Sequence, residues 1–224
     1  MKAALAEKRP RRRPRPEALS KERIRRAALA LIDAEGLEAF STRKLGAALG
    51  CEAMAIYWWY PSKDAIFDAV VDELMAKVGD VVAAPAPRLL EDDPKNWVDA
   101  LRGVARAYRG LARRHPNAFP LIATRRFATE ATYAFLERLF ELARRQGIDD
   151  RTIARYFRAV SAYCSGIALN ELASRREDTG APARARFPRV SAVSAWLAPE
   201  HFDELFEFGL DVLLERLARD ARAR

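Results

Sequence analysis

The fold is most strongly constrained by residues 41–63, which read STRKLGAALGCEAMAIYWWYPSK and predict two short helices joined by a tight turn. Ser41 is a candidate N-cap for the first helix, and an apolar stripe with helical spacing follows it. Gly50 stands where a helix end favours a positive φ, and Pro61 ends the second helix, which we expect over residues 53–60. Such a pair forms a helix-turn-helix unit, whose second helix can lie in a DNA major groove.

The second helix carries four consecutive aromatic residues at positions 57–60. A helix turns by about 100° per residue, so these side chains cannot all face one core. Ile56 and Tyr60 have the spacing of an inward pair, which leaves some of the other aromatic side chains pointing outward. They are either core or interface residues or part of a nucleic-acid surface. The second interpretation is favoured by the flanking basic residues Arg43, Lys44 and Lys63, because tyrosine O–H and tryptophan N–H groups donate to phosphates.

The positive charge is concentrated at the N-terminal end. The chain carries a formal net charge of +8, and residues 1–63 hold 14 Lys+Arg against 7 Asp+Glu. A polyanionic partner at this end is the economical explanation. Residues 1–19 form a basic arm that prolines keep from being a regular helix, so it is extended or disordered. The arm either enters a DNA minor groove or adds only non-specific attraction, through Arg11, Arg12, Arg13 and Arg15.

Composition predicts an all-α protein of two domains. The chain has 224 residues, half of them hydrophobic, and shows no sustained alternation of β-branched residues. Residues 20–80 are expected to form the helix-turn-helix domain, with a first helix between Ser20 and Gly36, and residues 93–220 a second helical domain. Residues 176–198 are expected to be a long loop. Apolar stripes predict further helices at 94–114, 117–124, 129–146, 150–175 and from Pro199 onward.

The residues that would support catalysis or metal binding are scarce. The chain has two histidines and two cysteines, and it lacks the P-loop, GxGxxG, GxSxG and HExxH motifs. Cys51 and Cys164 are expected to be buried thiols in a reducing cytosol. No apolar run approaches the ~18 residues that would span a bilayer. We therefore predict no cofactor, no metal, no catalytic residue and no membrane contact, and a location at the nucleoid in a bacterial cytoplasm.

The N-terminal residues resemble the DNA-binding domain of the tetracycline-repressor (TetR) family, most closely the branch that contains the tetracycline repressor itself. The resemblance covers about residues 20–75 and is specific because many positions agree in register. Beyond residue 80 it is one of helical layout only. The matching residues are Gly36-Leu37, Ser41-Thr42-Arg43-Lys44-Leu45, Leu49-Gly50, Ile56-Tyr57-Trp58 and Lys63.

The resemblance implies DNA contacts residue by residue. It places contacts at the start of the first motif helix, and phosphate contacts around the second. Three apolar residues fall at base-reading positions, which removes amide hydrogen bonds to bases and leaves van der Waals contact with groups such as thymine methyls. Trp59 stands where the branch has a histidine, and Gly46 replaces a usual alanine, which weakens its helix by up to ~1 kcal/mol. The predicted DNA-binding residues are Ser41, Thr42, Arg43, Ala53, Met54, Ala55, Tyr57, Trp58, Trp59 and Lys63.

In the second domain the resemblance implies a pocket for a small-molecule effector. The His/Asp ligands of a tetracycline–magnesium site are not found in this sequence, so the expected pocket holds no such metal site. Individually, the aromatic residues of this domain could equally be plain core. The candidate pocket residues are Trp97, Tyr108, Phe119, Phe127, Phe135, Tyr163 and Asn170, with Glu171 as a further polar contact.

The last two long helices carry apolar residues over more than one face, which suggests a second partner for burial. A homodimer fits best, and the resemblance implies dimerisation through a four-helix bundle. A two-fold dimer with two reading helices predicts an inverted-repeat operator on double-stranded DNA. The candidate interface residues are Tyr156, Phe157, Val160, Phe202, Phe206, Leu210 and Leu213.

We therefore expect a homodimeric transcriptional repressor that a small apolar or aromatic ligand releases from its operator. The helix after residue 63 is the expected link between pocket and DNA. Two other classes remain as alternatives. One is an α-helical enzyme, which would need a convergent acid/base or metal set. The other is an architectural DNA-binding protein without a ligand, which the apolar base-reading positions favour.

Overall fold

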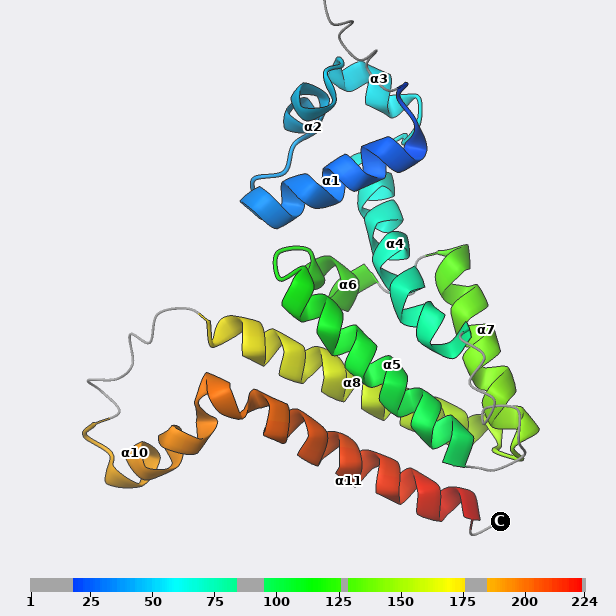
Figure 1. The fold of residues 1–224 in the computed structure, drawn as a ribbon, viewed down its shortest axis with the longest axis vertical. Helices are drawn as coiled ribbons and strands as arrows, with labels where there is room; N and C mark the ends of the chain where they lie inside the picture. The colour runs from blue at the N-terminus through cyan, green and yellow to red at the C-terminus, as the bar shows by residue number, and fades with distance from the viewer. Residues whose placement is uncertain (1–17, 84–94, 126–128, 176–184, 223–224) are drawn as a thin grey trace, which may run out of the picture.

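The computed structural model describes residues 18–83, 95–125, 129–175 and 185–222. Within these ranges every regular element is a helix, which confirms the predicted all-α class. Figure 1 shows a small N-terminal group of helices above a larger helical body. In chain order the elements are α1 (Lys21–Glu35), α2 (Thr42–Leu49), α3 (Ala53–Tyr57), α4 (Lys63–Ala83), α5 (Lys95–Arg114), α6 (Phe119–Arg125), α7 (Glu130–Arg145), α8 (Asp150–Ala173), α10 (Pro188–Ser194), η2 (Ala195–Leu197), η3 (Pro199–His201) and α11 (Phe202–Arg222).

Local signals set the ends of the first two helices. The Ser20 hydroxyl accepts a hydrogen bond from the Arg23 amide, and the Ser41 hydroxyl accepts one from the Lys44 amide. Each serine thereby satisfies an amide that has no partner within the helix. Gly50 ends α2 in the left-handed region, with φ 70°. Both caps and the glycine stop were predicted from the sequence, and the structure confirms them.

Residues 20–63, which we call the head, are built around a small apolar core. Its three helices and the first turn of α4 all contribute fully buried side chains. The Tyr60 hydroxyl also donates to the Lys21 carbonyl at 3.1 Å, which ties the end of the reading unit to α1. Burial raises the pKa of Tyr60. The core residues are Ile24, Ile32, Leu45, Ile56 and Ile66.

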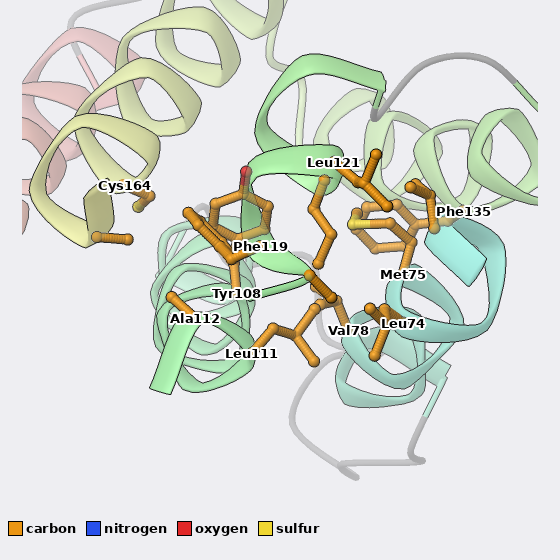
Figure 2. Close-up of a cluster of buried hydrophobic side chains, with 14 of the residues drawn as sticks. Leu74, Met75, Val78, Tyr108, Leu111, Ala112, Phe119, Leu121, Phe135 and Cys164 are labelled. Atoms are coloured by element: carbon orange, nitrogen blue, oxygen red, sulfur yellow. The ribbon is translucent and has the colours of Figure 1, made fainter. Parts of the chain in front are cut away.

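Helix α4 connects the head to residues 95–222, which we call the body. Its first part packs against α1, and Arg25 on α1 pairs with Glu73 on α4 at 2.6 Å. Its second part runs down among α5, α6 and α7 (Figure 1). Figure 2 shows side chains from these helices meeting in one apolar cluster, which includes Leu74, Met75, Val78, Tyr108, Leu111, Phe119, Leu121 and Phe135. The helix that supports the head is therefore also part of the core of the body.

In the body, α5 lies beside α8, and α11 packs against both of them (Figure 1). Charged pairs fasten α11 to α5 along its length. Arg106 makes two hydrogen bonds of 2.8 Å to Glu207, and Arg102 pairs with Asp211. At the start of α11, Arg109 pairs with Asp203 at 2.8 Å. An apolar face and a row of ion pairs thus hold α11 in place together.

Two local predictions differ from the structure. The reading helix α3 is shorter than expected and ends at Tyr57, after which residues 58 and 59 form a turn. The predicted loop over 176–198 is wrong for its described part, because residues 188–197 form α10 and η2. Pro188 stands at the first position of α10, where its fixed φ suits a helix start and its missing N–H costs nothing.

Candidate DNA-binding surface and effector cavity

The turn between α2 and α3 depends on a close approach of two backbone segments. The Cys51 amide donates to the Gly46 carbonyl at 2.9 Å. A Cβ atom on Gly46 would lie 2.7 Å from the Cys51 carbonyl oxygen, which is closer than side-chain carbons approach backbone oxygens. Glycine at this position therefore lets the two helices come close together, a benefit that the sequence argument about helix propensity missed.

Residues 53–60, which comprise the reading helix and the turn after it, bury one side and expose the other. Ile56 is fully buried and Tyr60 is 8% exposed, so the predicted inward pair is confirmed. Trp58 is 90% exposed and Met54 is 72% exposed. Large apolar side chains normally avoid such exposure in a group, so this surface is suited to binding a partner. Tyr57 and Trp59 are also exposed, and Ala53 and Ala55 are half-buried beside them.

The polar residues predicted to contact DNA differ in their contacts within the chain. The hydroxyls of Thr42 and Tyr57 lie 3.3 Å apart, which links α2 to α3 on the exposed side. Arg43 is exposed. The Lys63 ammonium donates to the Phe40 carbonyl at 3.2 Å and lies 5.1 Å from the centre of the Phe67 ring. Lys63 is an exposed residue whose ammonium is already bound to the Phe40 carbonyl of the head.

Several predicted residues lie outside the described part of the chain. They are the arginines of the basic arm and one pocket candidate, namely Arg11, Arg12, Arg13, Arg15 and Phe127. Their assignments stay predictions.

An apolar cavity of about 50 Å³ lies in the body between α4, α5, α7 and α8. Helix α4 contributes Met75 and Val78 to its wall, so the helix that carries the head also borders the cavity. The polar side chains at the wall already have partners nearby. The Tyr108 hydroxyl lies 3.1 Å from the Ser165 hydroxyl, and the Thr132 hydroxyl lies 3.1 Å from that of Thr129. The cavity is thus suited to an apolar occupant.

Two of the pocket candidates line this cavity and four do not. Tyr108 and Phe135 form part of its wall. Trp97 and Phe119 are fully buried elsewhere in the core, where the Phe119 ring meets the Tyr108 ring at 5.3 Å. The two others, Tyr163 and Asn170, also lie away from the cavity. The sequence analysis missed the other wall residues, which are Met75, Val78, Leu101, Val104, Ala105, Thr132, Leu136, Phe157, Val160, Ser161 and Cys164. Their spacing is that of any core stripe, so no signal separated them.

Tyr163 and Asn170, which were predicted as polar pocket contacts, do not line this cavity. The Tyr163 hydroxyl donates to the carbonyls of Leu205 and Phe206 at 2.8 and 3.0 Å, so it faces α11. Burial raises the pKa of Tyr163. Asn170 is exposed on the surface. Both residues lie on α8. Because a helix turns by about 100° per residue, their side chains point in other directions than the α8 side chains that line the cavity.

Glu171 is a structural ion-pair partner. Its carboxylate accepts hydrogen bonds from Arg109 at 2.9 Å and from Arg113 at 2.7 Å. Glu171 and Arg109 are both buried, and the Arg109 guanidinium lies 4.6 Å from the centre of the Phe206 ring. A buried carboxylate of this kind needs its cations to offset lost hydration. Glu171 is not among the residues that line the cavity.

The predicted interface residues pack within the chain. Five of them are buried and two, Phe157 and Leu213, are half-buried. The broad apolar stripe that suggested an interface at these positions is explained by the packing of α11 on α5 and α8. The exposed apolar residues of the two helices are Leu169, Phe208 and Val212. The buried five are Tyr156, Val160, Phe202, Phe206 and Leu210.

Ionic contacts join α4 to the end of α6 and the start of α7. Arg125 on α6 donates to Asp64 at 2.5 Å and to Asp68 at 3.1 Å. One turn further along α4, Asp72 accepts a hydrogen bond from Thr129, the N-cap of α7. Burial raises the pKa of Asp72. Three acidic residues on one face of α4 therefore hold it against the body.

The described residues contain no group of three or more His, Cys, Asp or Glu side chains placed to hold a metal ion. In the same residues, none of the helices is both long and apolar enough to cross a membrane.

Comparisons with known proteins agree with this architecture. Residues 24–70 match the family model of bacterial regulatory proteins of the tetR family. Residues 90–220 match the model of the tetracyclin repressor-like C-terminal domain, which spans more than half of the chain.

Two curated relatives and one solved structure are similar over most of their length. The transcriptional repressor DrrR1 of Streptomyces coeruleorubidus is 27% identical over 94% of this chain and 81% of its own. The class A tetracycline repressor of transposon 1721 from Escherichia coli is 30% identical over 87% of this chain and 88% of its own. A "possible TetR family transcriptional regulator" from Streptomyces coelicolor A3(2) superimposes with a TM-score of 0.74, at 25% identity over 88% of this chain and 98% of that one. The chain therefore belongs to the TetR family of transcriptional regulators, with a DNA-binding helix-turn-helix at its N-terminus and a ligand-binding domain at its C-terminus.

Proposed function

We propose that the protein is a homodimeric repressor that leaves an inverted-repeat operator when a small apolar ligand enters the body cavity. The observation that carries the proposal is the position of α4. Its first turns pack in the head, and its later residues Met75 and Val78 form part of the cavity wall. A ligand that changes the wall therefore acts on the helix that positions the head. The protein would act by binding rather than catalysis, in a bacterial cytoplasm.

The head would read DNA mainly through shape and apolar contact. Met54 is the most exposed of the three residues at base-reading positions, and its side chain suits thymine methyl groups. Trp58 and Tyr57 would donate to phosphates beside it, and Arg43 would reach a phosphate or a guanine. The basic arm at residues 1–19 would add attraction along the same duplex.

Dimerisation would use the exposed apolar side chains on α8 and α11. Leu169, Phe208 and Val212 are each more than 40% exposed, and they lie on the two helices that pack side by side at the edge of the body. A two-fold pairing of these faces would place two reading helices on one side of the dimer. The half-sites would then be separated by about one helical turn of DNA or a multiple of it.

The ligand would work by shifting a population between two dimer states. Only a ligand that binds those states with different affinity can change DNA binding. We infer that α4 moves between the two states. Its contacts with Arg125 and Thr129 couple that movement to the body. Hydrogen exchange over residues 63–83 should change when a ligand releases DNA. Unchanged exchange in α4 and the head, with DNA released, would show that the signal takes another route.

The decisive experiment is the selection of bound sequences from a random DNA library at about 150 mM salt. An enriched inverted repeat would establish a sequence-specific dimer, and its spacing would measure the distance between the two heads. Binding without enrichment, lost steeply as salt rises, would instead indicate a weakly specific architectural protein.

A further inference from the structure

The cavity in the body is too small for an effector of ordinary size. Its volume is about 50 Å³, whereas pockets that bury drug-sized ligands enclose ~300–1,000 Å³. A ligand of that class therefore needs space next to the cavity.

A surface groove of about 500 Å³ supplies that space between α7 and α8. Leu136 and Phe157 line both the groove and the cavity, so these two side chains form the partition between them. The Phe157 ring meets the Phe140 ring edge-on at 5.1 Å. Neither partition side chain has a polar atom, so each can change rotamer without breaking a side-chain hydrogen bond. Opening the partition would join the two hollows into one site of suitable size.

The two ends of the joined site differ in charge. The cavity end is apolar, whereas the groove is bordered by Arg144, Asp150 and Arg158. Arg144 makes two hydrogen bonds of 2.8 Å to Asp150, so these two charges neutralise each other. Arg158 is exposed and has no ion-pair partner among the described residues. Among the residues that line the groove, Arg158 is thus the one charged side chain without an ion-pair partner.

We propose that the effector is an elongated amphiphile with an apolar, aromatic body and an anionic end group. The apolar body passes Leu136 and Phe157 into the cavity, and the anion stays in the groove at Arg158. Two other ligand classes fit less well. A cationic end group would be repelled by Arg158, and a polyhydroxylated body would lose its hydration in the cavity without regaining hydrogen bonds. This inference rests on the proposed function, because it names the ligand class of the same regulator.

A pair of naphthalene dyes tests the inference on the full-length protein. 1-Anilinonaphthalene-8-sulfonate carries an anion, and N-phenyl-1-naphthylamine has the same rings without it. Both dyes gain fluorescence in apolar sites. We expect the sulfonate to bind at least tenfold more tightly. Arg158→Gln should remove that preference by weakening the sulfonate dye about tenfold, equivalent to ~1.4 kcal/mol, while the neutral dye is unaffected.

Matched variants locate the site. Arg155→Gln removes an exposed arginine of the same helix that does not line the groove, and it should change neither dye. Phe157→Ala removes half of the partition and should speed the association of both dyes in stopped-flow measurements. Trp196→Ala tests a separate exposed apolar residue and should leave the sulfonate affinity unchanged.

Three results would overturn the inference. They are equal affinity for the two dyes, sulfonate binding that Arg158→Gln does not weaken, and a signal that depends on Trp196 instead of Phe157. DNA selection on the same preparations separates this failure from that of the proposed function. An enriched inverted repeat alongside a failed dye test would reject only the ligand class, whereas no enriched repeat would reject the repressor itself.

Discussion

The imidazole Nδ1 of His115 lies 2.7 Å from a carboxylate oxygen of Asp33, and this contact joins the head to the body. Asp33 is in the last turn of α1, and His115 is in the turn between α5 and α6. The side-chain amide of the nearby Asn117 donates to the Asp33 backbone carbonyl at 2.9 Å. The other Asp33 carboxylate oxygen is buried without a hydrogen-bond partner among the described residues. Among the described residues, the Asp33 carboxylate therefore relies on His115 for its side-chain hydrogen bond.

Replacing His115 should destabilise this junction. His115→Ala leaves the partly buried Asp33 carboxylate without its side-chain partner, and we expect the free energy of unfolding in urea to fall by about 1–3 kcal/mol. A double-mutant cycle with Asp33→Asn should show a coupling of about 0.5–3 kcal/mol. His201→Ala is the matched control, because His201 lies 4.0 Å from Glu204 at the surface, and it should stay within about 0.5 kcal/mol. Additive effects of the first pair would contradict the prediction.

Gly209 should not tolerate a side chain. A Cβ atom there would lie 2.4 Å from the Tyr163 hydroxyl oxygen and 2.6 Å from a ring carbon, where α8 and α11 pack together. Alanine favours a helix by up to ~1 kcal/mol over glycine, but overpacking costs about 1–3 kcal/mol, so Gly209→Ala should lower the melting temperature. Gly166→Ala is the control, because a Cβ atom at Gly166 meets nothing within 4 Å, and it should raise stability. A stabilised Gly209→Ala would show that the two helices separate freely.

The attachment of α11 should weaken in acid. Hydrogen bonds from Arg113 and Arg109 lower the pKa of Asp203, and a hydrogen bond from Arg106 lowers the pKa of Glu207. Because the folded chain binds these protons less tightly than the unfolded chain, the carboxylates stabilise the fold above their ordinary pKa of ~4. That contribution is lost as the pH falls through the lower folded-state pKa values.

Urea unfolding between pH 7 and pH 3 measures this loss. Glu207→Gln should reduce the pH dependence below about pH 4, because the variant has one fewer carboxylate to protonate. The exposed Glu200 provides a control, and Glu200→Gln should follow the wild-type curve. Equal slopes for wild type and Glu207→Gln would show that the ion pairs of α11 do not govern acid stability.

Trp58 should contribute to DNA affinity without contributing to stability. Because its side chain is 90% exposed, Trp58→Ala should leave the melting temperature unchanged and raise the Kd for the selected operator about tenfold, equivalent to ~1.4 kcal/mol. Trp58→Phe should recover the share due to ring packing but not that due to the N–H donor. Trp196→Ala removes a tryptophan that is 69% exposed on the body and should leave the Kd unchanged. Fluorescence anisotropy measures all three, and an unchanged Kd for Trp58→Ala would remove Trp58 from the DNA surface.

The head was predictable because its signals are local. The caps at Ser20 and Ser41 and the stop at Gly50 each act within a few residues of the backbone they satisfy. The inward pair Ile56 and Tyr60 followed from helical spacing alone. Two features of the head were missed. The reading helix ends at Tyr57 and not at residue 60, and the close approach at Gly46 depends on the distance between two backbone segments.

The body was less predictable because each of its long helices packs against at least two others. Helix positions were found, but the direction of each side chain depends on which neighbour covers it. Tyr163 was expected in the pocket and instead donates to α11 carbonyls, and Glu171 was expected at the ligand and instead pairs with two arginines. Periodicity identifies a buried stripe without saying what buries it.

The sequence by itself determined the all-α class, the helix-turn-helix and its outward-facing reading helix, because caps, glycines and 3.6-residue spacing are local properties. The tertiary structure alone decided where the cavity lies, which residues wall it and which apolar side chains remain exposed for a partner. Those features arise where four or more helices meet. The free energy of burying a side chain there depends on residues far away in the chain, which no local pattern records.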